Sequence, residues 1–253
     1  MKKVFVLLFV LLLFSLLFLK EPPNKEHPEA VYSFLPLCGS SCRVVNHAYY
    51  TLCYNEKHEL AAWVYYVLSD SMIVGNAVRK NYFLKDSLVL SGTPSHSAYT
   101  NSGYDRGHLL PAADMKWNQL AMDETFLMSN VSPQSPYFNR NGLWRKLETK
   151  VREWAVNRNR LIVVVGGVLT DDLPKLGGQN VSVPKYYFKI ILDEKDFSSI
   201  SFLLENKTNS GLLSEFIVSV DSIEQISGID FFNFLPDSLE AVIEKSVGFN
   251  AWF

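Results

Sequence analysis

Three polar segments in the middle of the chain carry residue types suited to hydrolysing a phosphodiester. The first is Asp-Arg-Gly-His at 105–108, the second spans 130–134 and the third spans 139–148. A neutral histidine accepts a proton from water near pH 7. An amide oxygen is a hard donor that suits Mg²⁺, and a guanidinium grips phosphate oxygens in a bidentate way. Phosphodiester hydrolysis needs an activated water and charge stabilisation at the phosphate, so these types belong together chemically.

Taken in this order and at this spacing, the segments resemble the DNA/RNA non-specific endonuclease family, the ββα-metal nucleases. The resemblance rests on Asp-Arg-Gly-His at 105–108, Asn-x-x-Pro-Gln at 130–134, and Asn-x-x-x-x-Trp-x-x-x-Glu at 139–148. It extends from about His47 to the C-terminus. It implies a metal-dependent endonuclease that cuts DNA and RNA with little sequence preference, because such enzymes contact phosphates rather than base edges.

The resemblance also implies a role for each matching residue. His108 corresponds to the general base, Asn139 to the ligand of one Mg²⁺ or Mn²⁺ ion, and Glu148 to the residue that holds metal-bound water. The predicted catalytic residues are His108, Arg106, Glu148, Arg79 and Asn130, the predicted substrate-binding residues are Arg79, Arg106 and Gln134, and the predicted metal ligand is Asn139.

Each key residue also has a plain structural interpretation. His108 alone would be a hydrogen-bonded structural histidine, and Asn139 would be a helix N-cap. Glu148 would form a surface ion pair with Arg145 or Arg152. The series of motifs favours the catalytic interpretation for His108 and Glu148, whereas both roles are compatible for Asn139.

The charge distribution bears on nucleic acid as a partner. The formal net charge is −2 and the sequence pI is about 6.2, which alone argues against a phosphate-binding protein. Between Arg79 and Arg160, however, basic residues outnumber acidic ones, and beyond Leu161 the balance reverses. The middle of the chain is therefore expected to present a basic face that the average conceals.

The N-terminus predicts export from the cytosol. Lys2 and Lys3 precede an apolar run at 4–19, which is shorter than the ~20 residues of a typical spanning helix. No small-x-small cleavage pattern follows, so a signal peptide and a membrane anchor both remain open for residues 1–20. Among Cys38, Cys42 and Cys53, one disulfide and one free thiol would suit an oxidising compartment.

Periodicity predicts an α+β fold with a central, mostly antiparallel sheet flanked by helices, and the family resemblance implies that this fold carries a ββα-metal active-site motif. A proline-rich linker is expected at 21–40 and one endonuclease domain at 41–253. The expected strands are 47–54, 61–68, 127–131, 161–169, 182–192, 200–204 and 216–220, and the expected helices are 117–125, 141–157 and 237–245.

Two other functions are compatible with these observations. One is a phosphodiesterase of the same fold acting on another substrate. The other is a catalytically silent module that binds extracellular DNA, although such a module would not need a general base. The expected partners are DNA and RNA as substrates, the membrane if the N-terminus is retained, and a second copy of the chain in a homodimer.

Overall fold

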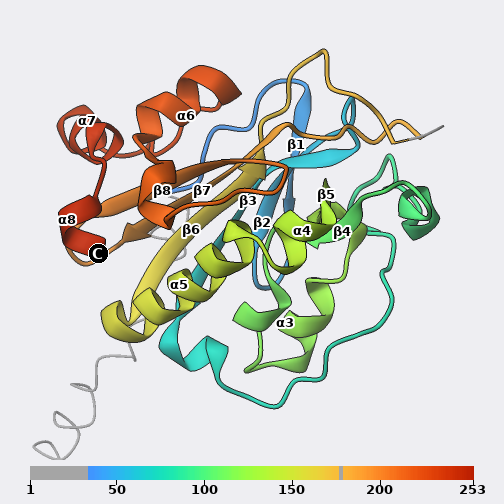
Figure 1. The fold of residues 1–253 in the computed structure, drawn as a ribbon, viewed down its shortest axis with the longest axis horizontal. Coiled ribbons are helices and arrows are strands. Elements are labelled where there is room, and N and C mark those ends of the chain that lie inside the picture. The colour runs from blue at the N-terminus through green and yellow to red at the C-terminus, as the bar shows by residue number, and fades with distance from the viewer. Residues whose placement is uncertain (1–33, 177–178) are drawn as a thin grey trace, which may run out of the picture. The chain divides into compact units, whose positions relative to one another are not determined.

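The computed structural model describes residues 34–176 and 179–253, and these build a seven-stranded sheet. The strand order is β1-β2-β3-β6-β7-β8-β9, and every neighbouring pair is antiparallel (Figure 1). The strands are β1 (Cys42–Asn46), β2 (Thr51–Asn55), β3 (Leu60–Ser69), β6 (Arg160–Gly167), β7 (Tyr186–Asp193), β8 (Ser199–Glu205) and β9 (Ile217–Val218). The predicted α+β class and antiparallel sheet are confirmed.

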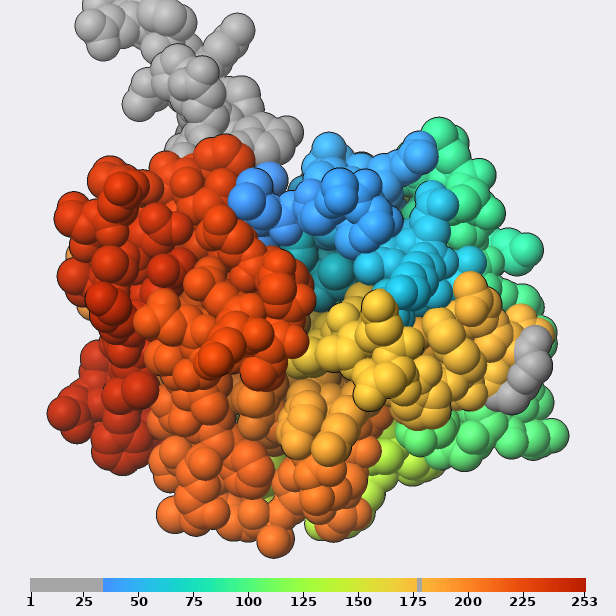
Figure 2. Space-filling view, turned by 90° about the horizontal axis from the view of Figure 1, so that it is seen from above, coloured from blue at the N-terminus to red at the C-terminus, as the bar shows by residue number. Residues whose placement is uncertain are grey.

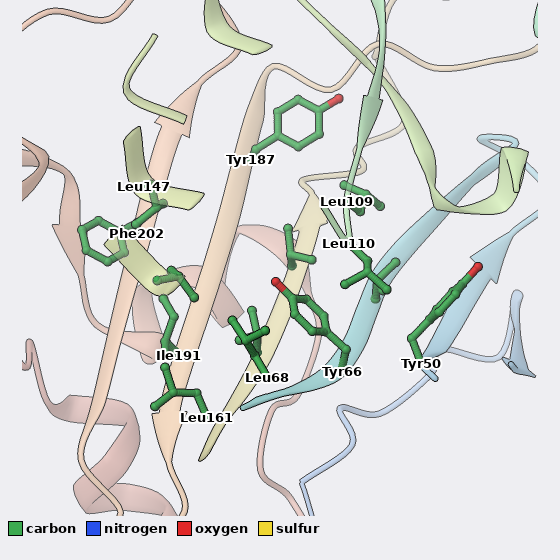
Figure 3. Close-up of a cluster of buried hydrophobic side chains, with 14 of the residues drawn as sticks. Tyr50, Tyr66, Leu68, Leu109, Leu110, Leu147, Leu161, Tyr187, Ile191 and Phe202 are labelled. Atoms are coloured by element: carbon green, nitrogen blue, oxygen red, sulfur yellow. The ribbon is translucent and has the colours of Figure 1, made fainter. Parts of the chain in front are cut away.

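Helices cover both faces of this sheet, because its central strands are apolar on both sides. In β6, Val163 packs into one cluster and Val164 into another, as expected from the alternation of side chains along a strand. The first cluster lies under α5, and part of it is drawn in Figure 3, whereas the second cluster lies under α6 and α7. The helices are α3 (Gln119–Glu124), α4 (Pro136–Arg140), α5 (Leu143–Arg158), α6 (Val220–Ser227), α7 (Asp237–Lys245) and α8 (Phe249–Trp252).

A separate two-stranded sheet carries the Asp-Arg-Gly-His segment. Its strands are β4 (Asp105–His108) and β5 (Val131–Gln134), paired antiparallel with His108 opposite Val131. The chain then turns through α4 into α5, so that two strands and a helix come together beside the large sheet (Figure 1). This is the ββα arrangement expected from the sequence.

Several elements differ from the expectation in a physically understandable way. The strand β1 and the helix α6 were not predicted, because each is short and β1 is largely exposed. The predicted 141–157 helix begins instead at Leu143, since Gly142 has an extended backbone at the N-cap. The predicted helix at 237–245 is present with those bounds.

The folded unit begins earlier than the predicted linker boundary at residue 40. Phe34 and Leu35 are buried against the sheet, and the Leu37 amide donates to the Asp230 carbonyl at 2.8 Å. Cys38 forms a disulfide with Cys53. Residues 34–40 therefore belong to the domain, because their apolar side chains complete its second core cluster.

The apolar N-terminal run and most of the predicted linker lie outside the described residues. Within the ranges that the structure does describe, no helix has both the length and the apolar character needed to cross a membrane.

In the space-filling view, the first described strands, in blue, lie beside the C-terminal segment, in orange and red (Figure 2).

Candidate active site

A cleft of about 380 Å³ opens where β4, α4 and α5 meet. Four of the predicted residues line it: Arg79, His108, Asn139 and Glu148. They come from a loop, a strand and two helices, so their meeting depends on the tertiary fold. The other lining residues are Pro111, Ala112, Ala113, Arg140, Arg145, Thr149 and Arg152.

His108 sits at the end of β4 in an aromatic setting. Its ring centroid lies 4.9 Å from that of Phe126 and 5.3 Å from that of Phe83, and the residue is only 8% exposed. Burial, assisted by the positive charge of Arg79, lowers the pKa of His108 to about 3. The imidazole is therefore neutral at physiological pH, which is the form that accepts a proton. Its Nε2 is buried without a hydrogen-bond partner in residues 34–176 and 179–253.

Asn139 is oriented by a carboxylate on the neighbouring strand. Its Nδ2 donates to Asp105 Oδ2 at 2.9 Å, and the same carboxylate accepts from Arg140 Nε at 2.7 Å. Because the amide nitrogen is held in this way, the amide oxygen is the atom left to bind a cation. Asp105 therefore fixes which end of the Asn139 amide faces the cleft.

Glu148 stands in the second turn of α5 and supplies a carboxylate to the cleft. Burial raises its pKa to about 7, although the nearby positive charges of Lys189, Arg152 and Arg79 act in the opposite direction. An amide oxygen and a carboxylate are the hard donors that Mg²⁺ prefers. The residues present therefore fit the divalent cation expected from the sequence.

This raised pKa predicts a pH-dependent affinity for Mg²⁺. Below pH 7 the carboxyl of Glu148 carries a proton that must leave before the group can help to hold a cation. The affinity should fall roughly tenfold for each pH unit below 7. Titration calorimetry with MgCl₂ between pH 8 and 5.5 measures it, and Glu148→Gln should flatten the profile. An affinity of the wild-type protein that stays constant over this range would contradict the assignment.

Beneath Glu148 lies a buried polar network that sequence reasoning missed. Asp114 is 1% exposed and accepts from Arg152 Nη1 at 2.9 Å and from the Tyr66 hydroxyl at 3.0 Å. The fully buried Lys189 Nζ lies 4.9 Å from the centre of the Trp144 ring. A lysine within the apolar strand β7 was the available signal. Arg152, four residues after Glu148, entered the sequence analysis only as an ion-pair partner.

Comparison with known proteins decides the family. Residues 30–238 match the family described as DNA/RNA non-specific endonuclease, which is more than half of the chain. The chain belongs to this endonuclease family. The resemblance stated from the motifs is therefore confirmed.

The individual relatives of the chain are also named as nucleases. "Nuclease EXOG, mitochondrial" of Mus musculus is 33% identical over 238 residues, or 85% of this chain and 63% of that protein. "Endonuclease G, mitochondrial" of Homo sapiens is 31% identical over 72% of this chain and 67% of its own length. A solved EndoG/EndoGI complex matches with a TM-score of 0.71 and 28% identity, over 79% of this chain and 89% of that one. The chain thus spans less than two thirds of the mouse relative.

The predicted role of Arg106 as a phosphate-binding residue needs correction. Its guanidinium donates from Nε and Nη2 to the His96 carbonyl at 2.9 and 2.6 Å, and from Nη2 to Thr100 Oγ1 at 3.2 Å. It also lies over the Tyr99 ring and does not line the cleft. Arg106 therefore braces the loop before β4, and of the two predicted phosphate grips only Arg79 reaches the cleft.

Asn130 and Gln134 also act from beneath the site. Asn130 is fully buried, its Oδ1 accepts from the Leu110 amide at 2.8 Å, and its Nδ2 donates to the carbonyls of Leu110 and Thr125. It is a positioning residue for the segment after His108, since none of its polar groups is left for substrate. Gln134 is likewise fully buried, so it cannot contact substrate as predicted.

The side chain of Gln134 explains why position 107, in the Asp-Arg-Gly-His segment, is a glycine. A β-carbon added at Gly107 would overlap the side chain of Gln134 on the paired strand. Gly107→Ala should therefore destabilise the fold by about 1–3 kcal/mol through overpacking. Thermal unfolding measures this, and the double variant Gly107→Ala/Gln134→Ala should recover part of the loss. Equal stability of Gly107→Ala and the wild type would show that the side chain of Gln134 does not exclude a β-carbon at position 107.

Proposed function

We propose that this protein is a metal-dependent endonuclease that hydrolyses phosphodiester bonds of DNA and RNA with little sequence preference. The observation that carries the proposal is the convergence of His108, Asn139, Glu148 and Arg79 on one cleft. A general base, an oriented amide oxygen, a carboxylate and a guanidinium are together what phosphodiester hydrolysis requires. The printed names of the relatives point to the same reaction class.

Each residue of the cleft has a separate role in the proposed hydrolysis. Neutral His108 accepts a proton from the attacking water, and Arg79 neutralises charge on the phosphate. Asn139 would hold one Mg²⁺ or Mn²⁺ ion through its amide oxygen, and the carboxylate of Glu148 would hold water bound to that ion. When bound, this ion supplies Lewis-acid stabilisation of negative charge at the phosphate and the leaving oxygen. Asp105 keeps the Asn139 oxygen available, and Asn130 keeps His108 in place.

A basic groove continues from the cleft along α5 and suits a nucleic-acid backbone. It has a volume of about 450 Å³ and shares Arg140, Arg145 and Thr149 with the cleft. Lys146 and Lys150 of α5 also line it, and Glu153 is the one acidic residue among its described lining. Contacts with phosphates through such a groove carry no base information, which supports weak sequence preference.

This groove predicts a measurable salt dependence. Lys146→Ala should weaken binding of DNA of any sequence and reduce the slope of log affinity against log salt by roughly 1. Fluorescence anisotropy with a labelled duplex at several KCl concentrations measures the slope. Lys245→Ala, on the opposite face of the large sheet, serves as the matched control and should leave the slope unchanged. Equal salt slopes for Lys146→Ala and Lys245→Ala would show that the groove does not bind the nucleic-acid backbone.

We also propose that the protein works outside the cytosol. The apolar run at 4–19 and the Cys38–Cys53 disulfide support export, since disulfides persist in oxidising compartments. Relatives named mitochondrial make an organelle the competing location. Mass spectrometry of the mature N-terminus separates a cleaved signal from a retained anchor. Light scattering of the purified protein tests the homodimer expected from the resemblance.

The experiment that tests the proposed activity is direct. The chain without its apolar run is incubated with plasmid DNA or with RNA, in Mg²⁺ or in chelator. We expect cleavage of both nucleic acids in Mg²⁺ and none in chelator. Binding without cleavage in Mg²⁺ or Mn²⁺ would support the silent DNA-binding module. Hydrolysis of small phosphodiesters alone would support the phosphodiesterase.

A further inference from the structure

A second group of acidic side chains lies far from the cleft, on the opposite face of the large sheet. It is built on α6, on the loop that follows it and on α7, which cover the second core cluster. The carboxylates are those of Asp221, Glu224, Asp230, Glu240 and Glu244. The proposed nuclease mechanism uses none of these residues.

The carboxylates form two overlapping triads that share one member. Asp221, Glu224 and Glu244 each offer an oxygen within 4.8 Å of the others, and so do Asp230, Glu240 and Glu244. Asp221 and Glu224 come from α6, whereas Glu240 and Glu244 come from α7. The group therefore joins two helices that are separate in sequence, with Glu244 at its centre.

Glu244 distinguishes this group from an ordinary acidic surface. The residue is only 9% exposed, and its Oε1 is buried without a hydrogen-bond partner in the part of the chain that the structure describes. Glu224 Oε1 accepts from the Phe231 amide at 2.7 Å, so this neighbour is itself held in place. A buried carboxylate oxygen without a donor is costly, which points to a missing positive partner.

The protein itself supplies no such partner. Across residues 34–176 and 179–253, no lysine, arginine or histidine forms an ion pair with any of the five carboxylates. Burial, the neighbouring charges of Glu224, Glu240 and Asp221, and a side-chain hydrogen bond with Glu224 raise the pKa of Glu244 to about 8.

We infer that Glu244 and its surrounding carboxylates bind a Ca²⁺ ion that clamps α6 to α7. The chemistry favours Ca²⁺, which takes six to eight oxygen ligands in flexible geometry, whereas Mg²⁺ demands a tight octahedron and keeps its waters. Zinc prefers histidine and cysteine, and the two triads contain neither. The site stabilises the second core cluster and does not take part in cleavage.

Thermal unfolding after removal of metals by chelator, with and without 10 mM CaCl₂ in excess, tests the inference. The background variant Asn139→Ala removes the ligand proposed for the catalytic cleft, so that the response reports on the acidic group. In this background Ca²⁺ should raise Tm by about 5 °C, as expected for a weak site at saturating ligand. Glu244→Gln and the exposed Asp221→Asn, each added to this background, should lose most of this rise.

Two further comparisons sharpen the result. Without Ca²⁺, Glu244→Gln should be at least as stable as its parent, because it removes the buried acid, and with Ca²⁺ the order should reverse. Asp237→Asn, on α7 but outside both triads, is the matched control and should keep the full response to Ca²⁺. The inference is overturned if Ca²⁺ leaves Tm unchanged, or if Glu244→Gln and Asp221→Asn respond as strongly as the Asn139→Ala parent.

Discussion

Replacing His108 with alanine is expected to lower the rate of nucleic-acid cleavage by about 10³-fold while leaving DNA binding nearly intact. The imidazole is neutral and nearly buried against Phe83 and Phe126, so its task is to accept a proton in the chemical step. Loss of a positioned general base typically costs 10²–10⁴-fold. Measuring kcat together with Kd separates an effect on chemistry from one on binding.

The matched control is another histidine. His96 is exposed and contributes only its backbone carbonyl, which accepts from Arg106. His96→Ala should therefore cleave within a few-fold of the wild type. A His108→Ala protein that lost binding and cleavage in parallel would instead indicate a structural role. Its unfolding curve has to be compared with that of the wild type, because the ring also packs against two aromatic residues.

Replacing Asn139 with alanine is expected to have an effect of similar kind, with a loss of about 10²–10³-fold in cleavage at a fixed Mg²⁺ concentration. The reason is the amide oxygen, which Asp105 leaves available by accepting from the amide nitrogen. Raising the Mg²⁺ concentration should restore part of the rate, because the variant binds the ion more weakly. The measurement is the rate of plasmid nicking as a function of MgCl₂.

Two companion variants show whether the effect belongs to the ligand itself. Asn157→Ala removes an exposed amide on α5 that lines neither the cleft nor the groove, and it should retain most of the activity. Asp105→Ala leaves the Asn139 amide unoriented and should weaken metal affinity by about 10–100-fold. Equal Mg²⁺ dependence of the wild type and Asn139→Ala would remove Asn139 from the metal site.

The sequence was most informative where function depends on neighbours along the chain. The apolar stripe of α5, with Leu147 and Val151, lies in the core as its spacing predicts. Glu148, on the same helix, lines the cleft because its position relative to Asn139 is set by one turn and the start of α5. The resemblance of these motifs to the endonuclease family therefore pointed to His108, Asn139 and Glu148, and the fold brings these three residues to one cleft.

The sequence was least informative where a side chain must choose between partners that are distant in sequence. Arg106 lies within the tetrapeptide, yet its guanidinium turns to the His96 carbonyl rather than into the cleft. Asp114 comes from the short 3-10 helix Ala112–Asp114 and Lys189 comes from β7, and only the folded sheet brings them near Glu148. The strand β4 also escaped prediction, because Asp-Arg-Gly-His lacks the β-branched residues typical of strands.

The central claim is that a metal-dependent phosphodiester cleavage takes place at His108. Single-turnover cleavage of a labelled DNA duplex and of an RNA strand, with enzyme in excess, tests it most directly. The three conditions are wild type with Mg²⁺, wild type with chelator, and His108→Ala with Mg²⁺. We predict cleavage of both nucleic acids in the first condition alone, with binding by both proteins in Mg²⁺. Cleavage by His108→Ala at the wild-type rate, or by the wild type in chelator, would contradict the account.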